Sequence, residues 1–357
     1  MTHKLFDSIA MWPAATEDPD TIYYWINSVV NDDVMSLILQ SKAFKRLYDI
    51  SFLGALDYTH PGTEKISKKN RSRAEHSLHV AALAAYVAEK RNYAPELKRH
   101  LIIAALLHDV GHAPLSHSAE PLIKKEIGYG HHEAGEQIID GKQQLGKELS
   151  LNLKKHCDLS FIHSLLNMKA SQEDGGDLFY SPINIDTIDG ITRSHTYFTG
   201  FSSAHSTLAI ARASFISAPS KDHRILDDFW MMKERVYSGL INDEIGLVSD
   251  KTSEFFFMES SVCLSESDLY KSEKSWQQTH KPLFARLNSI LKKKSAPSWF
   301  SNAQVSFVHR KYFVLPDRDD TTRYGCKKEK KIKSFNIKIE PDSRQHSIKL
   351  NGIINEH

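Results

Sequence analysis

Histidines gather in one stretch of this sequence. Eight of the 19 histidines fall between positions 76 and 132, namely His76, His79, His100, His108, His112, His117, His131 and His132. An aspartate, Asp109, directly follows His108. Imidazole nitrogens together with carboxylate oxygens form the ligand set of borderline divalent cations such as Mn, Fe, Zn, Ni or Co. If the chain folds so that these side chains meet, we expect a metal site.

Two predicted helices bring the ends of this stretch together. Apolar residues recur at three- and four-residue spacing across 77–90, which is typical of a helix. Pro95 suits the first position of a second helix, which is apolar on every side across 101–107. Helices of about 14 and 15 residues rise ~21 and ~22 Å. In an antiparallel hairpin, His76 would therefore lie beside His108 and Asp109.

The remaining sequence predicts a mainly α fold. Further helices are expected at 119–127, 133–139, 159–168, 185–198, 205–216, 226–241 and 282–293. Polar and apolar residues alternate across 304–315 and 333–350, with a turn at 341–343, as they do in antiparallel strands. We predict an N-terminal segment at 1–20, a helical bundle at 21–215, and a smaller C-terminal α+β lobe at 216–357 that contains a short antiparallel sheet.

The composition excludes several classes of protein. Lys plus Arg number 46 against 44 for Asp plus Glu, a net charge of +2, which is too balanced for a protein that coats nucleic acid with its whole surface. The three cysteines are far apart in sequence, which indicates neither a disulfide framework nor a thiolate zinc site and fits a reducing compartment. No apolar run approaches the ~20 residues that span a bilayer. We expect a soluble, cytoplasmic protein with no membrane partner.

Four sequence segments resemble a known family. They are 73–77 (Arg-Ala-Glu-His-Ser), 108–117 (His-Asp-Val-Gly-His-Ala-Pro-Leu-Ser-His), 132–133 (His-Glu) and 184–189 (Asn-Ile-Asp-Thr-Ile-Asp). In this order and spacing they resemble the HD-domain superfamily of metal-dependent phosphohydrolases. Within it, they look most like deoxynucleoside triphosphate triphosphohydrolases. The resemblance covers roughly residues 40 to 215 and implies an HD-domain helical bundle.

The resemblance implies a role for each matching position. The implied metal ligands are His76, His108, Asp109 and Asp186. Asp186 is preferred to Asp189 because it matches the second aspartate of the family's Asp-hydrophobic-Asp segment. The implied catalytic residues are His112 and His132, which act on the phosphate and the leaving group, and Glu120, which pairs with such a histidine. The implied phosphate-binding residues are Arg73, His117 and Arg193.

These residue types suit phosphate hydrolysis. A divalent cation offsets the charge of the phosphate oxygens and lowers the pKa of a bound water toward ~7. A histidine, with an ordinary pKa of ~6.5, can protonate a leaving oxygen. An arginine offers phosphate a planar fork of donors. The implied cofactor is one divalent ion of Mn, Fe, Zn, Ni, Co or Mg, and a second ion is left open.

Four positions depart from the deoxynucleotide pattern. Phe52 stands where these enzymes commonly carry a glutamine that contacts the sugar, and Gly190 stands where a tyrosine usually packs on it. Ser194 replaces an aspartate that bonds the 3′-hydroxyl, and Thr187 replaces a common lysine. A site that lacks partners for one substrate group discriminates less at that group. We therefore expect phosphohydrolase chemistry with altered sugar recognition.

The best interpretation is a nucleotide phosphohydrolase, and two alternatives stay open. One is a phosphodiesterase or nuclease that acts on cyclic, dinucleotide or single-stranded nucleic acid substrates, and the other is a module that senses a nucleotide without cleaving it. Two lysine-rich runs, at 65–69 and 327–333, are either solvated surfaces or contacts to a polyanion. A homo-oligomer is expected by analogy with the family.

Overall fold

The structure is a computed structural model that describes residues 17–60, 71–216, 223–260, 262–293, 300, 304–319, 321–339 and 348–354. The helices of the first part are α2 (Ile22–Asn31), α3 (Asp33–Gln40), α4 (Lys42–Arg46), α5 (Leu56–Thr59), α6 (Arg73–Lys90), α7 (Pro95–Leu107), α8 (Ser116–Ile127), α9 (His131–Ile139), α10 (Lys147–His156), α11 (Leu159–Leu166), α12 (Asp177–Tyr180), α13 (Ile185–Thr199) and α14 (Thr207–Phe215). They are followed by α15 (His223–Val236), α16 (Glu244–Ser260), α17 (Glu266–Leu269), α18 (Glu273–Thr279), α19 (Lys281–Lys293), β1 (Gln304–Val314), β2 (Tyr324–Ile339) and β3 (Ile348–Ile354).

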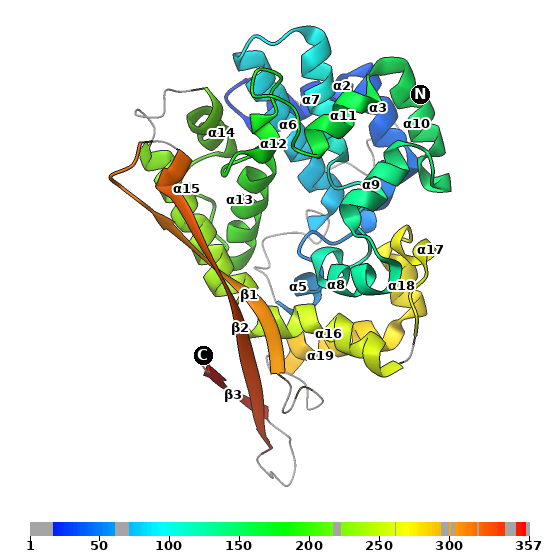
Figure 1. The fold of residues 1–357 in the computed structure, drawn as a ribbon, viewed down its shortest axis with the longest axis vertical. Coiled ribbons are helices and arrows are strands. Elements are labelled where there is room, and N and C mark those ends of the chain that lie inside the picture. Colours follow the sequence, from blue (N-terminus) through cyan, green and yellow to red (C-terminus); the bar gives the residue numbers. More distant parts are fainter. Residues whose placement is uncertain are drawn as a thin grey trace.

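The hairpin of α6 and α7 lies at the centre of the helical part (Figure 1). α6 begins where the side chain of Ser72 accepts the N–H of Glu75, and α7 begins at Pro95, as predicted. Both helices are buried on most sides, because small and apolar residues cover their surfaces. The predicted antiparallel pairing is confirmed, since Nε2 of His76 lies 3.2 Å from Nε2 of His108.

Several helices pack against this hairpin. α2 packs on α6, and α11 packs on α7, while α13 and α14 pack on α6 and on α15. α5, α8, α16 and α19 pack together in the lower part of the molecule, as Figure 1 shows. The prediction of a mainly α fold is confirmed. Among the described residues, no helix is both long enough and apolar enough to cross a membrane.

The predicted C-terminal antiparallel sheet is also confirmed. Its strand order is β1-β2-β3, and β1 pairs with β2 from Gln304 opposite Ser334 to Val314 opposite Tyr324. β2 begins before the predicted position 333, so the lysine-rich run at 327–333 lies inside a strand. The predicted turn at 341–343 lies outside the described residues. Trp230 of α15 packs edge-on against Tyr312 of β1, which joins the sheet to the helices.

Several helices were not predicted from the sequence. α2, with the sequence IYYWINSVVN, is rich in aromatic and β-branched residues, which have low intrinsic helix propensity. α3, α4, α10 and α16 were also missed. The helix predicted at 226–241 is α-helical as far as Val236, and Tyr237–Ile241 form a π-helical turn. Burial against neighbouring helices stabilises these segments, and a local pattern does not report that contribution.

The C-terminal residues share hydrophobic cores with the residues before them. One core joins α6 and α7 to α15, with Phe229 and Trp230 among its buried side chains. A second core joins α8 to later helices through Leu122, Phe257 and Trp276. The predicted boundary between 215 and 216 stays a prediction. Both hydrophobic cores contain side chains from both sides of it.

The buried carboxyl group of Asp57 on α5 makes the stability of the fold depend on pH. Burial raises the pKa of Asp57 to about 7, although the Leu53 amide, which donates to Oδ2 over 3.0 Å, opposes that rise. The folded protein therefore holds this proton more tightly than the unfolded chain does. Its contribution to the free energy of unfolding is full below the ordinary pKa and is lost as the pH rises through about 7.

We predict that Asp57→Asn becomes more stable relative to the wild type as the pH rises from 5 to 8.5. Each unit of pKa shift is worth about 1.4 kcal/mol, so we expect a relative gain on the order of 1–3 kcal/mol. Urea unfolding at both pH values measures the difference. The control is Asp33→Asn, at an exposed position of α3. A pH-independent difference between wild type and Asp57→Asn would contradict the prediction.

Candidate metal centre

Three predicted ligands meet at one point. His76 lies in the first turn of α6, His108 directly follows α7, and Asp186 lies in the first turn of α13. One ligand atom from each lies within 4.8 Å of the other two. Oδ1 of Asp186 is 3.0 Å from Nε2 of His76 and 3.8 Å from Nε2 of His108. The structure thus brings together side chains that are 110 positions apart in sequence.

The fourth predicted ligand, Asp109, lies beside this group. Its Oδ1 is 3.5 Å from Nε2 of His108, and its Oδ2 is 3.7 Å from Nε2 of His76. The Arg73 guanidinium donates to the same Oδ2 over 2.6 Å, and both side chains are buried. Burial alone would raise the pKa of Asp109, but the charges of His108 and Arg73 hold it well below its usual range. Asp109 is therefore ionised next to the two imidazoles.

Hydrogen bonds orient both imidazoles toward the same centre. Nδ1 of His76 is 2.7 Å from Oδ2 of Asp189, and Nδ1 of His108 is 2.8 Å from the carbonyl oxygen of Ala105. Hydrogen bonds of this kind hold the ring nitrogen that faces away from the ion, which is Nδ1 in both residues. They leave the second ring nitrogen, Nε2, free to bind the ion. Asp189 is not the aspartate that the family pattern favours as a ligand. Its position behind His76 gives it an orienting role instead.

The charge of this group suits a cation. Burial by itself lowers the pKa of His76, but hydrogen bonds to Asp186 and Asp189 raise it to about 9. A proton on His76 is therefore strongly favoured by the surrounding carboxylates. A divalent ion takes the place of such a proton and satisfies the same negative charge. The residues present thus fit a divalent metal ion in both ligand chemistry and electrostatics.

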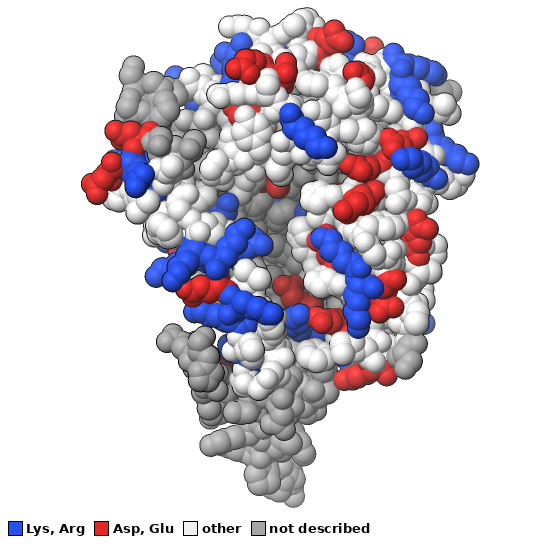
Figure 2. Space-filling model, viewed as in Figure 1, with Lys and Arg blue, Asp and Glu red and all other residues white. Residues whose placement is uncertain are grey.

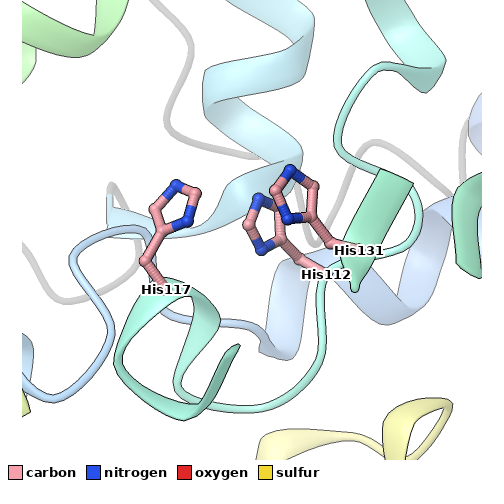
Figure 3. A group of neighbouring side chains, drawn as sticks. All are labelled: His112, His117 and His131. Atoms are coloured by element: carbon pink, nitrogen blue, oxygen red, sulfur yellow. The ribbon is translucent and has the colours of Figure 1, made fainter. Parts of the chain in front are cut away.

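A second histidine group lies next to the first one. His112 follows α7, His117 lies in α8, and His131 opens α9, and their ring nitrogens also come within 4.8 Å of one another. Figure 3 shows the rings of His112 and His131 face to face, with the ring of His117 opposite them. The ring centroids of His112 and His131 are 4.0 Å apart and nearly parallel. His132, predicted as catalytic, contacts His131 but is not part of this group.

Glu120 pairs with histidines other than the expected ones. The resemblance implied a pair with His112 or His132. In the structure, Oε1 of Glu120 is 2.7 Å from Nδ1 of His131, and Oε2 is 3.2 Å from Nδ1 of His117. Burial alone would raise the pKa of Glu120, but hydrogen bonds to His117 and His131 hold it well below its usual range. His131 is thus a site residue that the sequence resemblance did not assign.

The two predicted phosphate-binding arginines have partners inside the protein. Arg73 is 4% exposed, and it donates to Ser116 Oγ over 3.1 Å and to the carbonyl oxygen of Phe52 over 2.8 Å, besides Asp109. Nε of Arg193 donates to Asp189 over 2.9 Å. Both guanidinium groups therefore hold site residues in place. Their predicted contacts to phosphate stay predictions.

The ring of Phe52 covers one side of the first group. Its centroid lies 4.8 Å from that of His76, and the Arg73 and Arg193 guanidinium groups lie over the same ring at 4.9 and 5.7 Å. A Cβ added at Gly190 would lie 3.7 Å from Cζ of Phe52, which is ordinary contact. An apolar ring and a bare backbone thus border the candidate metal centre at two of the positions that depart from the expected deoxynucleotide pattern.

Glu273 of α18 holds two site loops together. Its Oε2 accepts the N–H of Leu115 over 3.0 Å and the N–H of Ser51 over 3.0 Å, and its Oε1 accepts the hydroxyl of Tyr58. Leu115 and Ser116 have left-handed backbone with φ of 61° and 47°, directly before His117. Such backbone is unfavourable for non-glycine residues and needs external support. Glu273 supplies that support from a segment for which the sequence predicted no role.

Figure 2 shows a hollow in the face of the molecule seen in Figure 1, between the part that contains α13 and α15 and the part that contains α8 and α9. Lysine and arginine side chains lie on both sides of this hollow, and aspartate and glutamate side chains lie beside them. The lysine-rich run predicted at 65–69 lies outside the described residues.

Known proteins share parts of this chain. Residues 73–175 match the HD domain family. An uncharacterised protein of Methanocaldococcus jannaschii is 33% identical over 163 residues, which are 46% of this chain and 30% of that protein. An uncharacterised protein of Mycoplasma pneumoniae is 24% identical over 303 residues, which are 78% of this chain and 67% of that protein.

The name of a third relative states an activity. The deoxynucleoside triphosphate triphosphohydrolase SAMHD1 homologue of Dictyostelium discoideum is 27% identical over 183 residues, which are 47% of this chain and 34% of that protein. The chain spans about a third of the length of the archaeal and the Dictyostelium relatives. The resemblance to the HD-domain phosphohydrolases is confirmed by these matches.

We predict that Asp189→Asn weakens metal binding without removing a ligand. Loss of a carboxylate that orients a metal-binding histidine typically costs 10–100-fold in affinity, and we expect the Kd for Mn²⁺ to rise by about that factor. Titration calorimetry on the metal-free protein measures the Kd. Asp177→Asn is the matched control, because Asp177 is a similarly buried aspartate paired with Arg91 at 2.6 Å. Equal changes in Kd for the two variants would contradict the prediction.

We predict that Glu273→Gln lowers the free energy of unfolding by about 1–3 kcal/mol, because a glutamine can present an acceptor to only one of the two groups of donors. Amide hydrogen exchange at 113–117 should also become faster, since these residues lose their support. Urea unfolding and exchange mass spectrometry measure the two effects. Glu244→Gln, which breaks a 3.1 Å pair with Lys333, is the control and should change stability by less than about 1 kcal/mol. Unchanged exchange at 113–117 would contradict the proposed support.

Proposed function

We propose, on the premise that residues 73–175 match the HD domain family, that the protein is a metal-dependent phosphohydrolase that acts on nucleotides. One observation carries the proposal. The imidazoles of His76 and His108 and the carboxylate of Asp186 converge. Oδ1 of Asp109, 3.5 Å from Nε2 of His108 and 3.2 Å from Nε2 of His112, joins them to the group of His112, His117 and His131. The likeness of the Dictyostelium relative, a deoxynucleoside triphosphate triphosphohydrolase by name, supports nucleotides as the substrate class.

A divalent ion bound here would neutralise charge at the phosphate and lower the pKa of a bound water molecule. His76, His108 and Asp186 would hold it, with Asp109 at its side. Asp109 stays ionised, so it can accept a hydrogen bond from an attacking water and orient it. Glu120 lies 3.2 Å from Nδ1 of His117 and 2.7 Å from Nδ1 of His131, so it orients both imidazoles beside the site.

Exposure supports a direction of approach for the substrate. The Asp186 side chain is 59% exposed and that of His117 is 62% exposed, whereas His76 and His112 are almost fully buried. The exposed members of the two groups thus lie on the side that a substrate can reach. The buried members form the rigid floor on which the phosphate would be positioned.

We propose that sugar recognition differs from that of ordinary deoxynucleotide hydrolases. The hydroxyl of Ser194 donates to the carbonyl oxygen of Gly190 over 2.7 Å, so its proton is used within α13. Phe52 and Gly190 offer no hydrogen-bonding side chain beside His76. A site built this way gains affinity from the phosphates and the metal and discriminates weakly between ribose and deoxyribose.

The nuclease alternative receives less support from the described surface. Several lysines of the β2 run pair with acids, since Lys327 lies 2.5 Å and Lys331 lies 3.8 Å from Glu329, and Lys333 lies 3.1 Å from Glu244. These pairs reduce the surplus positive charge that would attract a nucleic acid backbone. Oligomeric state and compartment stay predictions.

The proposal predicts that the purified protein with Mn²⁺, Mg²⁺, Ni²⁺ or Co²⁺ releases triphosphate and a nucleoside from both deoxynucleoside and ribonucleoside triphosphates. Chromatography and mass spectrometry of the products identify the bond that is cleaved. His108→Ala with Asp109→Ala should lose at least a thousandfold in rate, since a removed metal site leaves only residual catalysis. The control, His156→Ala on α10, should keep the wild-type rate.

Three other results would revise this proposal. Cleavage confined to deoxynucleoside triphosphates would contradict the altered sugar recognition. Nucleoside monophosphates released from oligonucleotides would favour the nuclease. Nucleotide binding without any hydrolysis under all four metals would favour the sensing module.

A further inference from the structure

We propose that Lys233 of α15 and Arg310 of β1 bind a phosphate group of the substrate other than the one at which the metal would act. The inference rests on the proposed function, because it adds a subsite for the same ligand and makes the length of the phosphate chain a determinant of recognition. Both residues lie outside the segment 73–175 that matches the HD domain family. The sequence predicted no role for either residue.

Lys233 is a buried cation. It is 8% exposed, and within the described part of the chain its ammonium makes no hydrogen bond and no ion pair. Its Nζ lies 4.6 Å from the centroid of the Trp230 ring and 4.9 Å from that of the Tyr312 ring. The ring faces attract the positive charge, but they offer its N–H donors no oxygen acceptor. A buried ammonium in this state favours an anionic ligand that supplies such acceptors.

Arg310 brings a second cation to the same aromatic cluster. Its guanidinium lies 5.6 Å from the centroid of the Tyr237 ring, and its Nη1 donates to the Tyr237 hydroxyl over 3.2 Å. The rings of Tyr237 and Tyr312 are 4.9 Å apart, so the two cations lie against neighbouring rings. Among the residues that the structure describes, no carboxylate forms an ion pair with Arg310.

The electrostatics of Lys233 relate it to both Arg310 and the candidate metal centre. Burial lowers the pKa of Lys233 to about 8, the carboxylate of Asp186 opposes this decrease, and the guanidinium of Arg310 adds to it. The two cations therefore repel each other, and Lys233 also lies within electrostatic range of a predicted metal ligand. An anion held between the two cations would relieve their repulsion.

The fold places these cations beside the hollow that borders the metal centre. α15 packs on β1 and on α13, and Asp186 lies in the first turn of α13. The part of the molecule that contains α13 and α15 forms one side of the hollow, and lysine and arginine side chains gather there (Figure 2). A phosphate chain that extends from the metal centre along this side would reach Lys233.

Backbone contacts hold the cluster rigid. Oε2 of Glu234 accepts the N–H of Tyr312 over 2.6 Å, and Nε1 of Trp230 donates to the carbonyl oxygen of Gly325 over 3.1 Å. These two bonds tie α15 to both β1 and β2. Cations that are already fixed in position lose little conformational entropy when they bind a ligand. The arrangement is thus suited to an anion of defined position.

The first test is the binding of inorganic triphosphate, measured by titration calorimetry on the full chain after its metal has been removed. Loss of charge-assisted hydrogen bonds should raise the Kd about 10–100-fold in Lys233→Met. Arg310→Gln, at a half-buried position, should raise the Kd in the same direction and tests the subsite even if Lys233→Met does not fold. Arg224→Gln, at an exposed position of the same helix, is the matched control and should keep the wild-type Kd.

The second test separates phosphate binding from a purely structural role. With Mn²⁺ present, kcat/KM is measured for ATP and for bis(p-nitrophenyl) phosphate, which has a single phosphate group. Lys233→Met should lower the ratio of the first value to the second about 10-fold or more, mainly through the KM for ATP. A structural defect would lower both values alike and leave the ratio unchanged.

The outcomes distinguish this inference from the proposed function. Equal Kd values for triphosphate in the wild type, Lys233→Met and Arg310→Gln would overturn the subsite, and so would a wild type that binds no triphosphate. Nucleotide hydrolysis with a KM for ATP that Lys233→Met leaves unchanged would also overturn it, while the proposed function would stand. Triphosphate binding that depends on Lys233, in a protein that hydrolyses no nucleotide, would support the subsite and contradict the proposed function.

Discussion

The site depends on the buried ion pair between Arg73 and Asp109, whose charged atoms lie 2.6 Å apart. Arg73 begins α6 and Asp109 follows α7, so this contact fixes the open end of the central hairpin. The guanidinium also binds Ser116 and the backbone of Phe52, which ties two further loops to the same point. Leaving either buried charge unpaired would cost about 3–5 kcal/mol. The pair therefore places an ionised carboxylate between both histidine groups and keeps it there.

Residues beyond the segment 73–175 that matches the HD domain family also support the site. Glu273 supports the left-handed backbone before His117. Arg46 donates to carbonyl oxygens of Leu269, from that region, and of Val110, which directly follows Asp109. Apolar packing of α8 on later helices adds to these polar contacts. The geometry of the histidine groups thus depends on residues on both sides of the predicted domain boundary. Both hydrophobic cores cross the same boundary.

The sequence predicted the parts that local patterns encode. Alanine-rich periodicity, Pro95 and the spacing of His76 and His108 were enough to predict the hairpin and the convergence of its ligands, because helix geometry converts sequence distance into position. Asp186 was found only through the family motif. Asp189, His131 and Glu273 could not be assigned, since their roles come from neighbours 113, 11 and 158 positions away, respectively. The aromatic-rich helix α2 was missed because tertiary burial outweighs its low propensity.

The central claim is that a cation binds between His76, His108 and Asp186. The most direct measurement is anomalous X-ray diffraction from crystals of the full chain grown with Mn²⁺ or Zn²⁺ and recorded on both sides of the absorption edge of the metal. The account predicts an anomalous peak about 2.0–2.3 Å from Nε2 of both histidines and from a carboxylate oxygen of Asp186. Anomalous density that appears only elsewhere on the protein, with these three side chains bonded to one another, would contradict it.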